Sequence, residues 1–134
     1  MAIKILVIED NPADVYLLEE ALRANDVDFN LEWIADGEQA LTRLSRVPDG
    51  AEPALVLVDL NLPRVDGKEL LSAIRQTPAF RDTLVAVLTS SDSPADRRDT
   101  EALGANCYIK KPPTLDEFLS IGRVIKELIS GVSS

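Results

Sequence analysis

The stretch at residues 54–67, which reads ALVLVDLNLPRVDG, limits the folds available to this chain more than any other. Its residues Leu55–Val58 form an unbroken apolar run, which is typical of a strand buried on both faces of a parallel sheet. Asp59 follows the run directly. Because an unpaired charge is costly to bury, we expect this carboxylate at the carboxyl end of the strand, where open α/β sheets bind their ligands.

Further apolar runs alternate with helical patterns along the chain. We expect strands at 3–8, 29–35, 84–88 and 106–109, and helices from Pro12, after Asp36-Gly37, and at 68–76, 94–103 and 115–129. Asn11 before Pro12 is a typical helix start, and the first helix carries one apolar face made of Val15, Leu18, Ala21 and Leu22. This alternation predicts an α/β fold, with a parallel sheet covered by helices on both faces.

The order of the strands follows from their sequences. The second strand alternates apolar and polar residues and the fifth is short, which places both at the edges of the sheet. The three fully apolar strands belong inside it. We therefore predict the flavodoxin-like, doubly wound (βα)5 fold, with a five-stranded parallel sheet in the order 2-1-3-4-5. This order places the second and fifth strands at the edges and the three apolar strands inside.

Two of the expected helices have unusual apolar faces. The helix at 94–103 has little to bury, so we expect it to be loosely held. The helix at 115–129 has more apolar residues than one core face needs. We expect Leu115, Phe118, Ile125 and Ile129 to face the sheet, with a flank made of Ile121, Val124 and Leu128. Surplus apolar surface marks interaction sites, although cover by a neighbouring helix explains it equally well.

Length, charge and composition exclude several classes of protein. At 134 residues the chain fits one domain, which we place at 1–130, with a frayed tail at 131–134. The net charge of −9 argues against a nucleic-acid surface, and no apolar run is long enough to span a membrane. Histidine is absent, which removes Ser-His triads, His-ligated zinc and a phosphohistidine within this chain. The single Cys107 and the lack of a signal peptide predict a cytoplasmic protein.

Polar side chains follow four of the expected strands: Glu9 and Asp10 the first, Asp59 the third, Thr89 the fourth and Lys111 the fifth. Because the carboxyl ends of parallel strands share one edge, these residues should converge there. Three converging carboxylates repel one another without a cation, and Mg²⁺ prefers carboxylate oxygens and accepts a phosphate oxygen. With an amine and a hydroxyl beside them, the acids predict a phosphoryl-transfer site in which Asp59 is the nucleophile.

Each of these residues also has an ordinary structural explanation. Glu9 and Asp10 could complement a helix dipole, and Asp59 could open a turn. Thr89 is of a type common at strand ends, and Lys111 could be a solvated lysine. The combination favours the functional interpretation, because these groups close different strands at the same edge.

Four segments carry a resemblance to a known family: ILVIEDNP at 5–12, LVLVDLNLPRVDG at 55–67, AVLTSS at 86–91 and GANCYIKKPP at 104–113. Along nearly its whole length the chain resembles the receiver domain of two-component response regulators. The resemblance implies that Asp59 accepts a phosphoryl group from the phosphohistidine of a sensor histidine kinase. It also implies Mg²⁺, or Mn²⁺, bound by Glu9 through a water molecule and by Asp10, Asp59 and the backbone carbonyl of Asn61.

The same resemblance implies roles for residues around Asp59. Thr89 and Tyr108 would form a switch pair, in which the hydroxyl moves to the phosphate and the ring swings inward behind it. Lys111, rather than Lys110, matches the family's lysine, and Pro112 matches its cis-proline. A protein of this kind is a signalling phosphoacceptor and not an enzyme, since it assists only its own phosphorylation and dephosphorylation.

More narrowly, EDNPADVYLLEEAL at 9–22 together with KKPP at 110–113 looks like the small regulators that pair with phytochrome-type histidine kinases. The chain has no room for an output domain, so we expect a stand-alone regulator without nucleic-acid or membrane partners. The fourth helix, fifth strand and fifth helix would form a homodimer or kinase-docking face that phosphorylation switches.

Two other classes of function compete with this interpretation. A phosphatase of the haloacid-dehalogenase type also uses a strand-end Asp nucleophile with Mg²⁺, but it needs a second acid two residues later, where this chain has Asn61. A phosphorylation-independent binding module could have lost some of the site residues. Here all are present: Glu9, Asp10, Asp59, Thr89 and Lys111.

Overall fold

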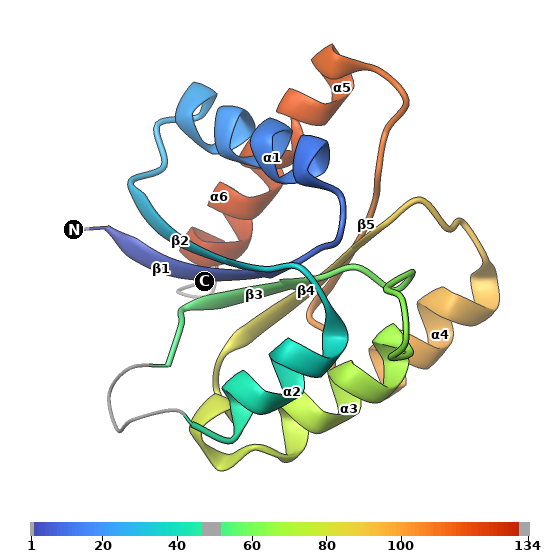
Figure 1. Ribbon diagram of the computed structural model, residues 1–134. Helices are drawn as coiled ribbons and strands as arrows, with labels where there is room; N and C mark the ends of the chain where they lie inside the picture. Colours follow the sequence, from blue (N-terminus) through green and yellow to red (C-terminus); the bar gives the residue numbers. More distant parts are fainter. Residues whose placement is uncertain (1, 47–51, 132–134) are drawn as a thin grey trace.

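The structure is a computed structural model that describes residues 2–46 and 52–131 of the chain. Its centre is a parallel five-stranded sheet in the predicted order, β2-β1-β3-β4-β5 (Figure 1). The strands are β1 Ile3–Ile8, β2 Phe29–Ile34, β3 Leu55–Val58, β4 Leu84–Thr89 and β5 Cys107–Lys110. The alternating strand β2 and the short strand β5 lie at the edges, which confirms the inference from their sequences.

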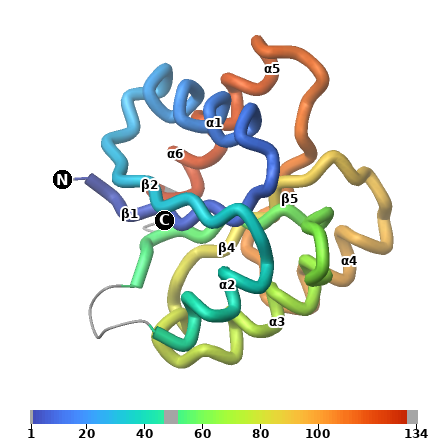
Figure 2. The backbone as a smooth tube through the Cα atoms, in the orientation of Figure 1, coloured from blue at the N-terminus to red at the C-terminus, as the bar shows by residue number. Residues whose placement is uncertain are grey.

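Helices cover both faces of the sheet. They are α1 Pro12–Ala24, α2 Gly37–Leu44, α3 Gly67–Gln76, α4 Pro94–Ala102, α5 Leu115–Leu119 and α6 Ile121–Gly131, with a short 3₁₀ helix, η1, at Pro78–Phe80. The ribbon and the tube both show α1, α5 and α6 on one face and α2, α3 and α4 on the other (Figure 1, Figure 2). None of the described helices is long and apolar enough to cross a membrane.

A hydrophobic core lies on each side of the sheet, and the central strands supply both. In β3, Val56 and Val58 pack with residues of α2 and α3, whereas Leu55 and Leu57 pack with residues of α1 and α6. Successive side chains of a strand point to opposite faces, so a strand covered on both faces must be apolar at every position. All of β3 is buried, which explains why the run has no polar residue before Asp59.

The predicted start of the first helix is confirmed. The Asn11 side chain accepts a hydrogen bond from the backbone N–H of Ala13 at 3.0 Å, and Pro12 is the first residue of α1. A cap of this kind stabilises a helix by about 1 kcal/mol. The buried residues of α1 are those that the spacing predicts: Val15, Leu18, Ala21 and Leu22. The cap and the apolar face together fix the start of α1 beside the carboxyl end of β1 (Figure 1).

Gly67 allows α3 to begin close to the loop that follows β3. A Cβ atom at this position would lie 2.5 Å from Leu60 Cα and 2.9 Å from the backbone oxygen of Asp59. Only glycine permits so close an approach. The loop that carries Asp59 is therefore packed directly against the first turn of α3.

The prediction of one helix at 115–129 is wrong, because the structure has two helices, α5 and α6, which meet at Ser120. The carbonyl of Leu119 accepts a hydrogen bond from the Asn25 side chain at 3.1 Å, and the Ser120 hydroxyl donates to the carbonyl of Glu117. Such side-chain bonds compete with the helical hydrogen-bond ladder. The predicted faces are corrected as well: Leu115 is 56% exposed, whereas Ile121 is buried in the core.

The helix α4 has the thin apolar face that its sequence indicates, and its loose attachment stays a prediction. Only Thr100 of α4 is buried, so this helix has few core contacts. At the end of the chain α6 includes Gly131, and the rest of the frayed tail predicted at 131–134 lies outside the described residues.

Candidate functional site

The acids that follow β1 and β3 lie together at one edge of the sheet. Glu9 and Asp10 follow β1, Asp59 follows β3, and each offers an oxygen atom within 4.8 Å of the others. Glu9 is 2% exposed and Asp59 4%, while Asp10 is exposed. The parallel sheet produces this grouping, because β1 and β3 are neighbours with Ile8 opposite Val58.

Lys111 brings a positive charge to these acids. Its ammonium nitrogen Nζ lies 2.5 Å from Glu9 Oε1 and 3.2 Å from Asp59 Oδ2. The backbone N–H of Lys111 donates to the carbonyl of Thr89 at 2.7 Å, which fixes the residue beside the end of β4. The residues at the carboxyl ends of β1, β3, β4 and β5 are thus brought together.

Asp14 adds a carboxylate that the sequence-based prediction lacks. Asp14 Oδ2 accepts a hydrogen bond from Lys111 Nζ at 2.8 Å. Burial alone would lower the pKa of Lys111, but the hydrogen bond to Asp14, the close contact with Glu9 and the charge of Asp59 raise it above its usual value. The signal that could have revealed Asp14 is its position as the third residue of a helix that begins beside the site.

Glu9 is held in a buried environment that opposes its negative charge. Its Oε2 accepts a hydrogen bond from the backbone N–H of Asn11 at 3.1 Å, while its Oε1 forms an ion pair with Lys111 without a well-oriented hydrogen bond. Burial raises the pKa of Glu9 to about 8; Lys111 opposes this rise and the charge of Asp59 adds to it. A hard divalent cation with oxygen ligands would offset the cost of the charge, so the acids fit such an ion.

Thr89, at the end of β4, is fully buried beside the acids. Its Oγ1 accepts hydrogen bonds from the Asn61 side-chain amide and from the backbone N–H of Ser91, both at 3.2 Å. Asn61 is held in turn by Asp59, whose Oδ1 accepts a bond from the Asn61 backbone N–H at 3.0 Å. Because a hydroxyl has one proton besides its acceptor positions, Thr89 retains a proton that it can donate.

Tyr108, on β5, is joined to Thr89 through Ser91. The Tyr108 hydroxyl donates to the carbonyl of Ser91 at 2.8 Å. Its half-buried ring lies against Arg97, whose guanidinium carbon is 4.4 Å from the ring centroid. The two residues of the predicted switch pair therefore contact the same short loop, between β4 and α4.

Polar contacts tie this loop and α4 to α3. The Ser91 hydroxyl donates to Asp96 Oδ2 at 2.5 Å, and Lys68 Nζ lies 2.7 Å from Asp96 Oδ1 and 2.9 Å from Asp99 Oδ2. The hydrogen bonds from Lys68 and Ser91 lower the pKa of Asp96. These contacts join α4, which buries only Thr100, to α3 and to the loop after β4.

The cis bond that the resemblance implies at Pro112 is not found, because no peptide bond among the described residues is cis. The trans form of an X-Pro bond is favoured by roughly 0.5–1 kcal/mol before any tertiary contact acts. Lys111 reaches the acids with a trans bond after it.

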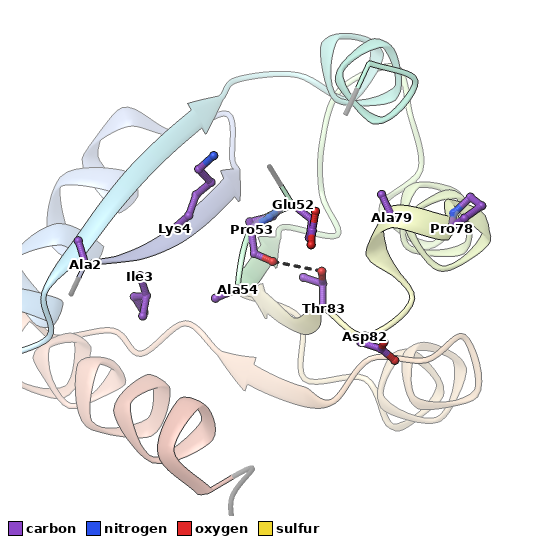
Figure 3. A pocket seen from close by; sticks show the side chains of 10 residues that line it. All are labelled: Ala2, Ile3, Lys4, Glu52, Pro53, Ala54, Pro78, Ala79, Asp82 and Thr83. Atoms are coloured by element: carbon purple, nitrogen blue, oxygen red, sulfur yellow. Dashed lines mark hydrogen bonds between the residues drawn. The ribbon is translucent and has the colours of Figure 1, made fainter. Parts of the chain in front are cut away.

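A hollow at the opposite end of the sheet has a different character (Figure 3). It is lined by residues around the amino ends of β1, β3 and β4, where the Thr83 hydroxyl donates to the carbonyl of Pro53 at 3.1 Å. Within the described ranges, Glu9, Asp10 and Asp59 are the one group of three acids placed to share a metal ion. The candidate chemistry therefore lies at the carboxyl edge of the sheet.

Known proteins share the sequence pattern of this chain. A family model described as the Response regulator receiver domain matches residues 5–122. Response regulator Rcp1 of Synechocystis sp. is 35% identical over 120 residues, which cover 87% of this chain and 82% of Rcp1. The probable methanogenesis regulatory protein FilR2 of Methanothrix harundinacea is 37% identical over 125 residues, which cover 92% of this chain and 81% of FilR2.

Solved structures share the fold over nearly the whole chain. The phosphorylated cyanobacterial phytochrome response regulator RcpA has a TM-score of 0.88 at 33% identity, covering 100% of this chain and 98% of RcpA. Rcp1 in its Mn²⁺-bound form has a TM-score of 0.83 at 34% identity, covering 93% of this chain and 92% of Rcp1. Since the family model spans most of the chain and two sequence relatives exceed 30% identity over most of their length, the chain belongs to the response regulator receiver domain family.

Proposed function

We propose that this protein accepts a phosphoryl group on Asp59 from the phosphohistidine of a sensor histidine kinase. A carboxylate oxygen of Asp59 forms a bond to phosphorus, the P–N bond to imidazole breaks, and the bonding electron pair stays on the imidazole nitrogen. The observation that carries the proposal is the position of Asp59, a buried carboxylate at the end of β3 with Lys111 Nζ 3.2 Å from its Oδ2. Because these 134 residues include no histidine, the phosphohistidine that donates the group lies outside them.

In this proposal Lys111 and Thr89 act on the transferred group. Protein catalysis of phosphoryl transfer depends on positioning and on stabilising the charge of the phosphoryl oxygens. The Lys111 ammonium contacts Asp59 directly, and the buried Thr89 hydroxyl has a proton to donate. Both groups would form charge-assisted hydrogen bonds with the phosphoryl oxygens.

We further propose that Mg²⁺, or Mn²⁺ in its place, binds Glu9, Asp10, Asp59 and the backbone carbonyl of Asn61. Two observations support the fit: the acids offer oxygens within 4.8 Å of one another, and the burial that raises the pKa of Glu9 to about 8 favours a nearby cation. When bound, the ion supplies positive charge near the transferred phosphoryl group. The Mn²⁺-bound form of Rcp1 supports the choice of ion.

Phosphorylation would then switch the segment between Thr89 and Lys110. If the Thr89 hydroxyl turns to the phosphoryl group, its hydrogen bond with the backbone N–H of Ser91 changes. The loop that carries Ser91 would then shift, and the Ser91 carbonyl is the acceptor of the Tyr108 hydroxyl. A phosphoryl group can drive this shift only through contacts that differ between the two states. Hydrogen exchange with and without a beryllofluoride mimic tests the switch: protection should change between residues 89 and 110, and unchanged protection there refutes it.

The proposed kinase is of the phytochrome type, on the strength of the likeness to RcpA. The similarity to FilR2, whose name refers to methanogenesis, does not point the same way. Phosphotransfer profiling against candidate histidine kinases, with Asp59→Asn as the control, shows which class of kinase is the partner. Faster transfer from a phytochrome-type kinase supports the pairing, and faster transfer from another class refutes it.

The proposed docking or dimer face consists of α4, β5, α5 and α6. Val124 is 38% exposed on this face, and Tyr108, Pro112 and Ile121 line a shallow hollow beside it. Sedimentation of the wild type against Val124→Glu tests dimerisation. A wild-type dimer that the substitution dissociates supports the dimer, and monomers in both samples refute it.

Incubation with acetyl phosphate and Mg²⁺ separates the proposed function from its alternatives. A labile mass gain of one phosphoryl group that is lost in Asp59→Asn supports the phosphoacceptor. Turnover of many phosphoesters indicates a phosphatase instead, although Asn61 stands where that enzyme needs an acid. The absence of any modification indicates a phosphorylation-independent binding module.

A further inference from the structure

We propose that Asp14 is a positioning residue for Lys111. When a divalent cation occupies oxygens of Glu9 and Asp59, Asp14 holds the Lys111 ammonium at the site. The inference rests on the proposed phosphoryl transfer to Asp59. It assigns a part in that reaction to a residue of α1 that binds neither the phosphoryl group nor the cation.

Lys111 has three carboxylate partners, two of which belong to the group of acids that can share a metal ion. Lys111 Nζ lies 2.5 Å from Glu9, 2.8 Å from Asp14 and 3.2 Å from Asp59. Glu9 and Asp59 are also among the acids whose oxygens come within 4.8 Å of one another. A divalent cation there would compete with the ammonium for these oxygens and repel it. Of the carboxylates that contact Lys111 in the described part of the chain, Asp14 alone lies outside that group.

The place of Asp14 in the fold suits this role. It lies in the first turn of α1, whose start is fixed by the Asn11 cap and Pro12. The Asp14 side chain is 17% exposed and that of Lys111 13%, so water screens their attraction only in part. A lysine ammonium on its flexible four-carbon chain needs a fixed partner to stay within reach of Asp59. Asp14 supplies one from a rigid element.

An acid in the first turn of a helix also has a purely structural explanation, because the helix dipole favours it. The chain offers a matched control for this effect. Glu69 is the third residue of α3, as Asp14 is of α1, and both are acids of a first turn. Glu69 is exposed and is not among the carboxylates that contact Lys111. Removing its charge therefore reproduces the dipole effect without the contact.

Trp33 provides a readout of cation binding that does not depend on phosphorylation. Its indole N–H donates to the backbone carbonyl of Glu9 at 2.6 Å, and it is the only tryptophan in the chain. Its fluorescence therefore reports on changes beside Glu9.

The experiment compares the wild type with Asp14→Asn, Asp14→Glu and Glu69→Gln, each well below its melting temperature. Mg²⁺ titrations followed by Trp33 fluorescence give the metal affinity, and intact mass after acetyl phosphate at saturating Mg²⁺ gives the phosphorylation rate. We expect Asp14→Asn to lower the phosphorylation rate roughly tenfold. Removing a residue that supports a site residue typically lowers activity by about 10–100-fold, and this is the lower end of that range. The change in Mg²⁺ affinity should be smaller. Asp14→Glu should restore most of the rate, and Glu69→Gln should match the wild type.

A second readout follows the ammonium itself. With Mg²⁺ and no phosphodonor, the NMR signal of the Lys111 ammonium should persist in the wild type and in Glu69→Gln. It should broaden in Asp14→Asn, where the group exchanges faster with water.

Three outcomes overturn the inference: a wild-type rate in Asp14→Asn, equal losses in Asp14→Asn and Glu69→Gln, or no recovery in Asp14→Glu. A wild-type protein that takes up no phosphoryl group overturns the proposed function instead. The two failures are therefore distinguishable.

Discussion

Replacing Arg75 should destabilise the fold far more than replacing an exposed arginine, because its guanidinium joins helix α3 to two loops, the one before β4 and the one before β5. Nε donates to the carbonyl of Gly104 at 2.9 Å, Nη1 to the carbonyl of Thr83 at 2.7 Å, and Nη2 to the Asn106 side chain at 2.8 Å. Asn106 Oδ1 also accepts the backbone N–H of Val85 at 2.9 Å. Arg75 therefore holds the point where β4 and β5 begin; Tyr108 lies on β5, and Lys111 directly follows it.

We expect Arg75→Met to lower the free energy of unfolding by about 3 kcal/mol. A hydrogen bond from a charged donor contributes roughly 1.5–3 kcal/mol, so the three shortest bonds of Arg75, each taken at the lower end, sum to about 4–5 kcal/mol. The side chain is half-buried, and water replaces part of this loss. With an unfolding entropy of about 2.1 cal/mol/K per residue, a loss of about 3 kcal/mol in 134 residues lowers the melting temperature by roughly 10 °C.

Thermal and urea unfolding followed by circular dichroism measure this loss. Arg123→Met is the matched control, because Arg123 also lies on a helix and pairs with Glu127 at 3.3 Å but is 77% exposed. The control should change the free energy of unfolding by less than about 0.5 kcal/mol. Equal losses in the two variants, or a loss at Arg75 below about 1 kcal/mol, would refute the reasoning that these bonds hold the β4–β5 edge.

Gly122→Ala should destabilise the protein by about 2 kcal/mol in urea unfolding, because a Cβ atom there would lie 2.0 Å from the carbonyl oxygen of Ala21; wild-type stability would contradict this. Mg²⁺ affinity, followed by tryptophan fluorescence, should fall as the pH drops below about 8, because burial raises the pKa of Glu9 to that value and the proton then competes with the cation. Without a cation, the same shift makes the free energy of unfolding fall as the pH rises from 4.5 to about 8, since the folded state binds this proton more tightly than the unfolded state. Both dependences should be absent in Glu9→Gln, and their persistence there would assign them to another group. Lys68→Met should speed hydrogen exchange in α4 several-fold, since Lys68 pairs with two aspartates of that helix; unchanged exchange would show that other contacts hold α4.

The strand order and the location of the site could be predicted, because both depend on patterns that extend over whole strands. The run Leu55–Val58 is apolar throughout since helices cover both faces of β3, and the alternation in β2 reflects its place at the edge. Parallel strands bring their carboxyl ends to one edge whatever the details of packing. Asp59 and Lys111 could therefore be grouped before any contact between them was known.

What the sequence could not predict depends on single contacts between distant segments. The break between α5 and α6 accompanies a hydrogen bond from Asn25 to the carbonyl of Leu119, 94 residues away, and no periodicity encodes it. The contact of Asp14 with Lys111 joins residues 97 positions apart. The exposure of Leu115 was missed for a related reason, because the predicted face assumed one continuous helix.

The central claim is that Asp59 accepts the phosphoryl group with a cation at the neighbouring acids. Intact-protein mass and peptide mapping, after reaction with acetyl phosphate in the presence of Mg²⁺, test it most directly. The account predicts one phosphoryl group, mapped to Asp59, that is absent in Asp59→Asn and absent when the cation is removed. A modification that persists in Asp59→Asn, or one that forms equally well without a divalent cation, would contradict it.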